Sequence, residues 1–156
     1  NANRWNFRAL NSEPMSQGTR CHQLAEYIIF ESPLNMLCDA PTNYEKEPAY
    51  TKFLAQIPTV WDETVTISGE VSKYIVTARR KGNDWYVGGL NNWDARTLNI
   101  DLSFLGNPGD YAIEAFVNSD RRGTDYKHDT QLKVNGKQVS MSMHSGGGFL
   151  IKATRK

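Results

Sequence analysis

The hydrophobic residues of this chain change their spacing near Pro58, and this change constrains the fold more than any other feature. Before Pro58, apolar residues recur every three or four positions, as they do on one face of an amphipathic helix. After Pro58, they alternate with polar residues, as they do in strands with one buried face and one wet face. We therefore predict a mainly helical part over residues 1–58 and an all-β domain over residues 59–156.

The hydrophobic pattern of residues 1–58 predicts a helix, then a strand, then a second helix. Apolar residues have helical spacing over residues 16–31, and Pro33 ends this helix because proline disfavours helical backbone in the residue before it. Residues 34–38 form a short, mostly apolar run that predicts a buried strand. Residues 42–45 have the Thr-x-x-Glu form of a capping box, and a second apolar helix stripe follows over residues 50–57.

A single buried strand between two helices cannot satisfy its own hydrogen-bonding groups. A parallel strand needs neighbours on both sides and helices over both faces of its sheet, and residues 1–58 supply one strand only. One interpretation is that these residues are the last unit of a larger repeating α/β structure. The alternative is an α+β domain in which residues 34–38 pair with a later strand.

The second part predicts eight short strands separated by turn residues. They are Thr64–Ile67, Lys73–Arg79, Trp85–Leu90, Thr97–Leu102, Tyr111–Val117, Gln131–Val134, Val139–His144 and Phe149–Ala153. The pair Asn135 and Gly136, between two alternating runs, predicts a hairpin because both turn positions favour positive φ. Eight strands with no helix between them are typical of an antiparallel sandwich or barrel.

Charge and composition exclude several functions. The chain has 18 basic and 17 acidic residues, so its net charge of +1 gives no reason to expect a nucleic acid or an anionic membrane as partner. No apolar run approaches the ~18 residues of a membrane span.

Cysteine and histidine residues predict no metal site. Cys21 and Cys38 are interpreted as small buried hydrophobes, with a single disulfide as the alternative. His22, His128 and His144 are scattered, and no spacing typical of a Cys or His metal site occurs.

The strongest site candidates follow the predicted strand at residues 34–38. Asp39 comes directly after it, and Asn43 and Tyr44 lie in the loop beyond. Residues at the carboxyl ends of strands line the active sites of α/β barrels and open α/β sheets, so these three residues are candidates for a substrate pocket. The alternative is that Asp39 and Asn43 only cap the next helix and shape the turn.

Asp62 and Glu63 are adjacent carboxylates that follow Trp61. The two carboxylates of a glycosidase face each other at roughly 5–10 Å, whereas neighbours in an extended segment point to opposite sides. We therefore interpret Trp61 as a hydrophobic plug at a domain junction, where Asp62 or Glu63 pairs with a basic side chain.

Trp93 lies in a polar loop and is the best candidate for an exposed aromatic residue. Flat aromatic faces stack on sugars, so a carbohydrate-binding module that uses Trp93 is an alternative function. The competing interpretation is ordinary packing, because tryptophan is common in cores and interfaces.

A set of short motifs stands in a fixed order along the chain. They are Ser16–Arg20, His22–Ala25, Glu31–Leu34, Asp39–Glu45, Pro58–Thr64, Trp85–Gly89, Asp101–Leu105, Asp120–Tyr126 and Gly146–Phe149. In this order, over about residues 12–153, they resemble the carboxyl-terminal part of glycoside hydrolase family 97.

The resemblance implies a mainly β fold with a specific domain arrangement. Members of this family have an amino-terminal β-sandwich, a central (β/α)₈ barrel and a carboxyl-terminal β-sandwich that is considered an oligomerisation module. Residues 16–57 would then be the last strand of the barrel with its flanking helices, and residues 59–156 the terminal antiparallel sandwich.

The resemblance also implies an activity for the parent protein. Members are exo-acting, calcium-dependent α-glycosidases, some inverting α-glucosidases and others retaining α-galactosidases. Their catalytic carboxylates and calcium-binding glutamates lie upstream of the matched segment, so none is transferred to this chain.

We therefore expect an inactive fragment of a bacterial α-glycosidase, without catalytic residues or a cofactor of its own. The sequence starts at Asn1 without a typical signal peptide, which we interpret as a processed or cut end. The expected partners are the upstream part of the same enzyme, an oligosaccharide bound by the parent, and a second copy of the chain. Periplasmic or secreted location follows from the resemblance. Glucoside or galactoside preference, and inversion or retention, are decided in residues outside this chain.

Overall fold

The computed structural model describes residues 2, 4–12, 15–37, 40–119 and 125–156. Three helices come first, and eight strands follow. The helices are α1 (Arg20–Ile29), α2 (Pro41–Glu45) and α3 (Pro48–Leu54). The strands are β1 (Glu63–Glu70), β2 (Tyr74–Lys81), β3 (Asp84–Asn91), β4 (Arg96–Asp101), β5 (Tyr111–Asn118), β6 (Tyr126–Asp129), β7 (Gln138–Met143) and β8 (Gly148–Arg155). Two 3₁₀ turns, Ser103–Leu105 and Pro108–Asp110, connect β4 to β5.

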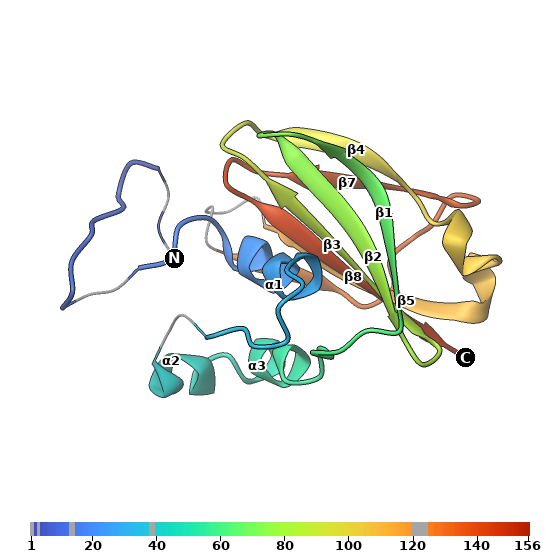
Figure 1. Cartoon of the computed structure of the whole chain (residues 1–156), viewed down its shortest axis with the longest axis horizontal. Helices are drawn as coiled ribbons and strands as arrows, with labels where there is room; N and C mark the ends of the chain where they lie inside the picture. Colours follow the sequence, from blue (N-terminus) through green and yellow to red (C-terminus); the bar gives the residue numbers. More distant parts are fainter. Residues whose placement is uncertain (1, 3, 13–14, 38–39, 120–124) are drawn as a thin grey trace.

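The strands form two antiparallel sheets that face each other (Figure 1). The larger sheet has the order β1-β2-β3-β8-β5-β6, and the smaller one pairs β4 with β7. The core between them includes Val87, Ile100, Met141 and Phe149. In β4 and β7 buried and more exposed side chains alternate, as their sequences predict. The prediction of a mainly β, antiparallel sandwich is confirmed.

The opposite face of the larger sheet is covered by α1 and α3. Their apolar stripes pack with outward-facing side chains of the sheet. This second core comprises Cys21, Leu24, Ile28, Tyr50, Phe53, Tyr86, Phe116 and Leu150. Strands β3 and β8 are therefore buried on both faces, which explains their nearly continuous apolar sequences.

Cys21 lies in this second core as a free thiol with no exposed surface. Burial raises its pKa to about 12, so the sulfur stays protonated at neutral pH. Cys21 is a small buried hydrophobe, as predicted, whereas Cys38 lies outside the described residues.

Helix α1 contacts the sheet closely because a glycine faces it. The helix starts at the Thr19 cap, whose hydroxyl accepts a hydrogen bond from the His22 amide at 3.1 Å. A Cβ atom on Gly88 of β3 would lie 2.8 Å from Ile28 Cβ and 3.0 Å from the Ala25 carbonyl oxygen. Any side chain at this position would push the helix off the sheet.

The predicted strand at residues 34–38 is wrong for residues 34–37, which have no strand structure. Leu34 and Met36 are 80% and 83% exposed, so the run is not buried either. A strand forms only beside hydrogen-bonding neighbours, and the described part of the chain places none beside these residues. Pairing of residues 34–37 with a later strand is thereby excluded. Cys38, the last residue of the run, lies outside the described residues.

The sequence predicted one helical segment over residues 42–57, whereas the structure has two short helices, α2 and α3. Pro48 begins α3, because a proline has no amide hydrogen to continue α2 into the next turn. The predicted capping box is also wrong. Thr42 lies inside α2, whose cap is Ala40 without a side-chain hydrogen bond, and Pro41 provides the helix start.

Seven of the eight predicted strands are confirmed within one to three residues at each end, and the eighth was misplaced. Residues 131–134 are not a strand, although Leu132 donates one backbone hydrogen bond to Ile113 at 3.0 Å. The strand is instead the polar segment β6, which pairs with β5. A turn is present here, but not in the predicted form. Gly136 has φ 60°, whereas Asn135 does not have positive φ. Paired backbone hydrogen bonds of 2.9 Å join Asn135 to Gln138, so the central residues of the turn are Gly136 and Lys137.

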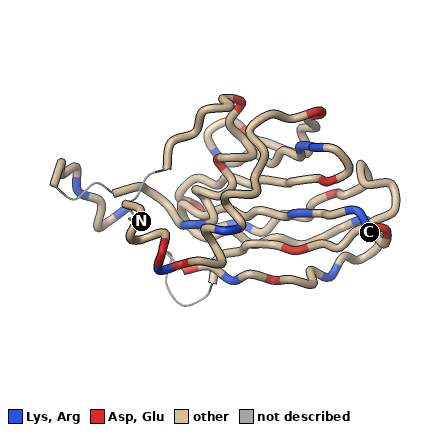
Figure 2. The backbone as a smooth tube through the Cα atoms, turned by 90° about the horizontal axis from the view of Figure 1, so that it is seen from below, with Lys and Arg blue, Asp and Glu red and all other residues tan. Residues whose placement is uncertain are grey.

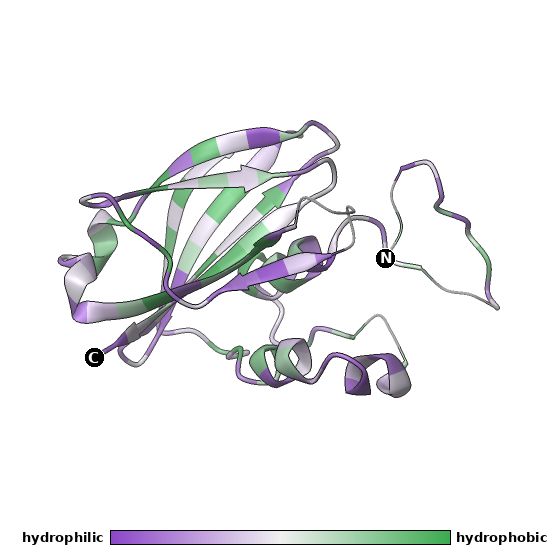
Figure 3. Cartoon of the chain, turned by 180° about the vertical axis from the view of Figure 1, so that it is seen from behind, coloured by the Kyte–Doolittle hydropathy of each residue, from purple (hydrophilic) through white to green (hydrophobic). Residues whose placement is uncertain are grey.

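The predicted domain boundary at Pro58 stays a prediction. Helices α1 and α3 precede it and pack on the sheet that follows it (Figure 1). Colouring by hydropathy shows green, hydrophobic segments along the strands of the sandwich and on the helices packed against it (Figure 3). In the described part of the chain, no helix is both long and apolar enough to span a bilayer.

We expect Gly88→Ala to lower the free energy of unfolding by about 1–3 kcal/mol, because the added methyl group overpacks the contact with α1. Urea unfolding followed by circular dichroism measures this loss. Gly69→Ala is the matched control, since its Cβ would meet neighbours at the ordinary distance of 3.4 Å or more. Equal losses in the two variants would contradict the close contact at Gly88.

Candidate functional site

The predicted pocket residues fall on or near α2. Asp39 lies outside the described residues. Asn43 is exposed, and its carboxamide oxygen accepts a hydrogen bond from Lys46 Nζ at 3.2 Å. Tyr44 is half-buried, and its carbonyl accepts from Thr51 Oγ1 at 2.8 Å. Their role in lining a substrate pocket stays a prediction.

An apolar groove runs between residues 33–37 and α3, and we call it the helical groove. One depression of about 380 Å³ is lined by residues that include Tyr27, Leu34, Leu54 and Ile57. An adjoining depression of about 810 Å³ is lined by Leu37, Pro41, Tyr44, Glu45, Pro48, Thr51, Lys52 and Ala55. Leu34, Met36 and Leu37 are exposed along its edge. Exposed apolar patches of this kind mark surfaces that contact another body.

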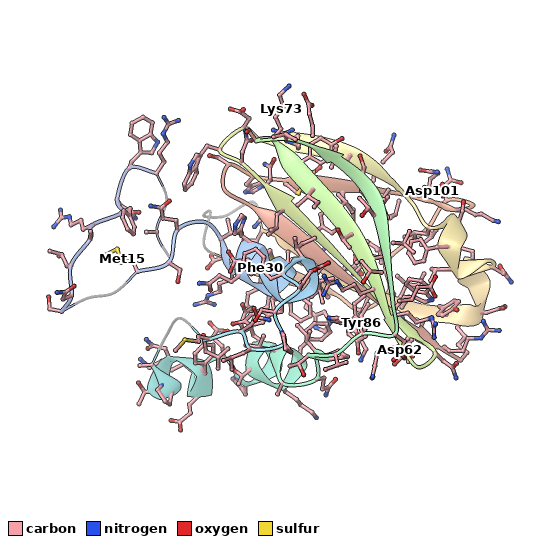
Figure 4. All side chains as sticks on the ribbon, viewed as in Figure 1. Met15, Phe30, Asp62, Lys73, Tyr86 and Asp101 are labelled. Carbon is pink, nitrogen blue, oxygen red and sulfur yellow. The ribbon has the colours of Figure 1, made fainter. Side chains whose placement is uncertain are left out.

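Trp61, Asp62 and Glu63 lie where the helices meet the larger sheet. The Trp61 ring packs edge-on against Tyr86 with 5.3 Å between centroids. Asp62 accepts hydrogen bonds from the Gly82 amide at 2.7 Å and Lys81 Nζ at 3.1 Å, and these bonds hold its pKa below the usual range. Figure 4 shows Asp62 at the helix-covered end of the sheet.

Glu63 forms a separate ion pair, with 3.0 Å between Oε2 and Arg80 Nε. The two neighbouring carboxylates therefore hold the start of β1 against β2, each with its own cation. This geometry suits anchoring, because neither carboxylate is paired across a cavity with the other. The proposed role of these residues at a domain junction stays a prediction.

Arg79 is a buried cation that the sequence pattern did not single out. Its Nη1 and Nη2 atoms donate to the carbonyls of Phe30 and Ile29 at 3.2 and 3.3 Å, at the carboxyl-terminal end of α1. Its guanidinium also lies 6.0 Å from the centre of the Trp61 ring. A cation at this end of a helix is favourable because the last carbonyls carry partial negative charge. The sequence signal that could have identified Arg79 is its position as a charged residue in β2, a strand that is otherwise largely buried.

A second cluster ties α1, α3 and β6 together. Arg20 Nη1 lies 2.8 Å from Glu47 Oε1, and Tyr126 donates its hydroxyl to Glu47 Oε2 at 3.2 Å. The hydroxyl of Tyr50 donates to the Arg20 carbonyl at 3.2 Å. The hydrogen bond from Arg20 lowers the pKa of Glu47. These residues are far apart in the sequence, so no local pattern predicted their contact.

Trp93 is half-buried against the loop that joins β7 to β8, whereas Trp5 is 89% exposed, so the prediction that Trp93 is the best candidate for an exposed aromatic residue is wrong. A side chain at Gly146 would collide with its ring. The loop is held in place by the Thr19 amide, which donates to the Gly146 carbonyl at 3.0 Å, and by His22 Nδ1, which lies 3.0 Å from the Gly147 carbonyl. The stacking of a sugar on Trp93 stays a prediction, with part of the ring committed to this loop.

Charged residues of both signs are interspersed along the backbone (Figure 2). Among the residues that the structure describes, no group of three or more His, Cys, Asp or Glu side chains is arranged to hold a metal ion. The groups that do converge form ion pairs and apolar contacts between elements of the chain itself.

These features define a class of protein: an antiparallel β-sandwich whose larger sheet is covered by helices with an apolar outer groove. A family model described as "Glycosyl-hydrolase 97 C-terminal, oligomerisation" matches residues 60–154. The chain belongs to this family.

Named relatives agree with the family. The chain is 52% identical to a retaining alpha-galactosidase of Bacteroides thetaiotaomicron over 97% of its own length. It is 27% identical, over 81% of its length, to a probable retaining alpha-galactosidase of Streptomyces bingchenggensis. These matches span 23% and 19% of the two relatives, so the chain corresponds to about a fifth of their length.

A solved structure shares the fold. A glycoside hydrolase family 97 enzyme from Pseudoalteromonas sp. strain K8, in complex with acarbose, matches with a TM-score of 0.81 and 29% identity. The match covers 89% of this chain and 23% of that enzyme. Because it extends over more of this chain than residues 60–154, it includes helical elements that precede the sandwich.

We expect Arg79→Met to lower the free energy of unfolding by about 1–3 kcal/mol, because it leaves two carbonyls at the end of α1 without their donor. Arg80→Met is the matched control. It removes a more exposed cation that pairs with Glu63, and we expect a loss below about 1 kcal/mol. Chemical unfolding of both variants measures the difference, and a larger loss in Arg80→Met would contradict the capping role.

Glu47 predicts a pH dependence of stability. Its pKa is lowered from 4.5 in the folded chain, so the stability it contributes is complete above that value and is lost as pH falls through the folded pKa. We expect the difference in Tm between wild type and Glu47→Gln to shrink as pH falls below 4.5. Thermal unfolding at a series of pH values measures it, with Glu45→Gln on exposed α2 as control. A difference that is constant with pH would show that Glu47 does not act through its charge.

Proposed function

We propose that this chain is the carboxyl-terminal part of a longer α-galactosidase, in which it supports the catalytic barrel without supplying catalytic carboxylates. The observation that carries the proposal is the 52% identity to a retaining alpha-galactosidase over 97% of this chain. That match spans 23% of the relative, which leaves most of the relative's length for a catalytic domain.

The proposal includes the helical part of the chain. Residues 16–57 would be the last elements of a (β/α)₈ barrel, in which residues 34–37 would form a strand only beside the strands of the upstream part. The exposure of Leu34, Met36 and Leu37 supports this assignment, because neighbouring barrel strands would cover these side chains and supply the hydrogen bonds that a strand needs. The helical groove would then face the rest of the barrel, with Asn43 and Tyr44 on the same side.

The sandwich would support the barrel through the anchors described above. Arg79 fixes the end of α1 on β2, and Arg20 fixes its start on α3 and β6 through Glu47 and Tyr126. Since α1 is the helix that would precede the last barrel strand, these contacts would hold that strand in position. The chain would affect catalysis only by holding the last strand of the barrel in position.

The chemistry of the parent follows from the resemblance to family 97. The proposed parent is a bacterial enzyme, periplasmic or secreted, that uses calcium and hydrolyses an α-glycosidic bond of an oligosaccharide. Among the described residues, no group of three or more His, Cys, Asp or Glu side chains could hold the ion, so we propose that the calcium site lies in the upstream part. Galactoside is proposed over glucoside because the named relatives are galactosidases.

Hydrolysis of p-nitrophenyl α-galactoside and α-glucoside tests the proposal. We expect no hydrolysis by the 156-residue chain, and hydrolysis of the galactoside by an enzyme that carries this chain behind its full upstream part. In that enzyme, Asp62→Asn and Glu63→Gln should change kcat by less than about threefold, because both carboxylates only pair with cations.

Two results would contradict the proposal. Hydrolysis by the 156-residue chain alone would place the active site within it. A loss of kcat of about 10²-fold or more in Asp62→Asn or Glu63→Gln would show an acid–base role.

A further inference from the structure

We infer that the turn between β1 and β2, with the apolar surface beside it, is the place where two copies of this chain associate. We call this surface the sheet tip, and define it as Gly69, Val71, Tyr74, Ile75 and Leu90. The inference rests on the proposed function, in that the sandwich belongs to a family described by oligomerisation. It adds the surface and the residues that would make the contact.

The first observation is exposed apolar surface. Val71 is 93% exposed and Ile75 is 37% exposed, and the sheet tip borders a depression of about 490 Å³. Within residues 60–154, the exposed large apolar side chains of the described chain are Val60, Val71 and Ile75, so two of the three lie at the tip. Apolar side chains gathered in this way on an otherwise polar strand end are typical of a contact surface.

The depression exists because α1 covers only part of the outer face. Ile75 pairs with Leu90 across β2 and β3, and with Gly69 across β1 and β2. The nearest side-chain atom to a Cβ on Gly69 would be Ile75 Cγ1, at 3.8 Å, so the glycine leaves a hollow beside the isoleucine. Helix α1 lies over Gly88, Gly148 and Leu150 of β3 and β8, whereas the depression is lined by residues of β1, β2, the turn between them and the end of β3.

The second observation is a fixed, strained turn. Ser72 has φ 66°, and it is the one non-glycine residue with positive φ in the described part of the chain. Asn92 holds the turn, with its side-chain amide on the Ser72 carbonyl at 3.1 Å and its backbone amide on the Lys73 carbonyl at 2.8 Å. A strained backbone persists only where its surroundings fix it, and here the bonds from Asn92 fix the backbone of the turn that carries the exposed Val71. Such a preformed surface loses little entropy on association.

The third observation is a pair of opposite charges beside Val71. Glu70 and Lys73 flank Val71 and form an ion pair of 2.5 Å between Oε1 and Nζ. In a twofold dimer the same patch meets itself, so each Glu70 can face the Lys73 of the other copy. Because a negative and a positive side chain flank Val71, the sheet tip can form ion pairs with the same surface of a second copy of this chain.

The contact is made by side chains and not by extension of the sheet. Strand β1 is an edge strand, but its register with β2 shifts between Thr66 and Ser68. A bulge of this kind twists an edge strand and disfavours pairing with another edge.

The sheet tip also lies away from the helical groove. Figure 4 shows Lys73 at the upper end of the sheet and Asp62 at the lower end, and Figure 1 shows α2 and α3 below the sheet. A second copy at the tip would leave the groove open for the upstream part of the parent.

Sedimentation equilibrium of the 156-residue chain tests the inference. We expect reversible association between about 1 and 100 µM, and a rise of the dimer Kd by about 100-fold or more in Val71→Asp/Ile75→Asp, because the change buries four like charges in the twofold contact. Val60→Asp is the matched control, since Val60 is 60% exposed and lies outside the tip. Its Kd should stay within about twofold of wild type. Thermal unfolding confirms that each variant is folded, and Val71→Ser serves as a milder variant with an expected rise of about fivefold.

Each outcome decides the inference. A wild-type chain that is monomeric over the whole concentration range overturns the inference. An unchanged dimer Kd in the double variant also overturns it, because the two copies would then associate through another surface. An equal rise in Val60→Asp would place the interface elsewhere. None of these results concerns hydrolysis by the longer enzyme, so the proposed function is tested independently of the dimer contact.

Discussion

The close contact between α1 and the larger sheet is the constraint on which the rest of the structure depends. It buries strands β3 and β8 on both faces, and it requires Gly88 under Ile28. Without α1 and α3, Tyr86, Phe116 and Leu150 would lose the helical side of their core, at a cost of about 1.5–3 kcal/mol for each large apolar side chain that becomes exposed. The sandwich and the helices before Pro58 are therefore one packing unit, whichever of them belongs to a larger domain.

Electrostatics fix the same contact at both ends of the helix. Arg79 lies at the carboxyl-terminal end, where it is buried and bonded to main-chain oxygens. Arg20 lies at the amino-terminal end and reaches Glu47. Cations that are held by partners from other elements give a helix an orientation as well as stability, which apolar packing alone does not do.

The sequence predicted the elements whose stability comes from within the chain. Alternation in β4 and β7 was sufficient, because the side chains of these strands meet a sheet that the same chain provides. Prediction failed where partners decided the outcome. Residues 34–37 have strand-like composition without a strand beside them, and β6 has a polar sequence but gains order from His128, whose ring stacks on Phe116 at 4.2 Å. The site was predicted in part for the same reason: Trp61, Asp62 and Glu63 are neighbours in sequence, whereas Arg20, Glu47 and Tyr126 meet only in the folded chain.

The buried thiol of Cys21 can be used to measure how often the contact between α1 and the sheet opens. It lies fully buried under α1, and its high pKa keeps it unreactive while the helix is in place. A thiol reagent can reach it only during the intervals when α1 lifts from the sheet. The rate of covalent labelling of Cys21 therefore reports how often the helices separate from the sandwich under native conditions.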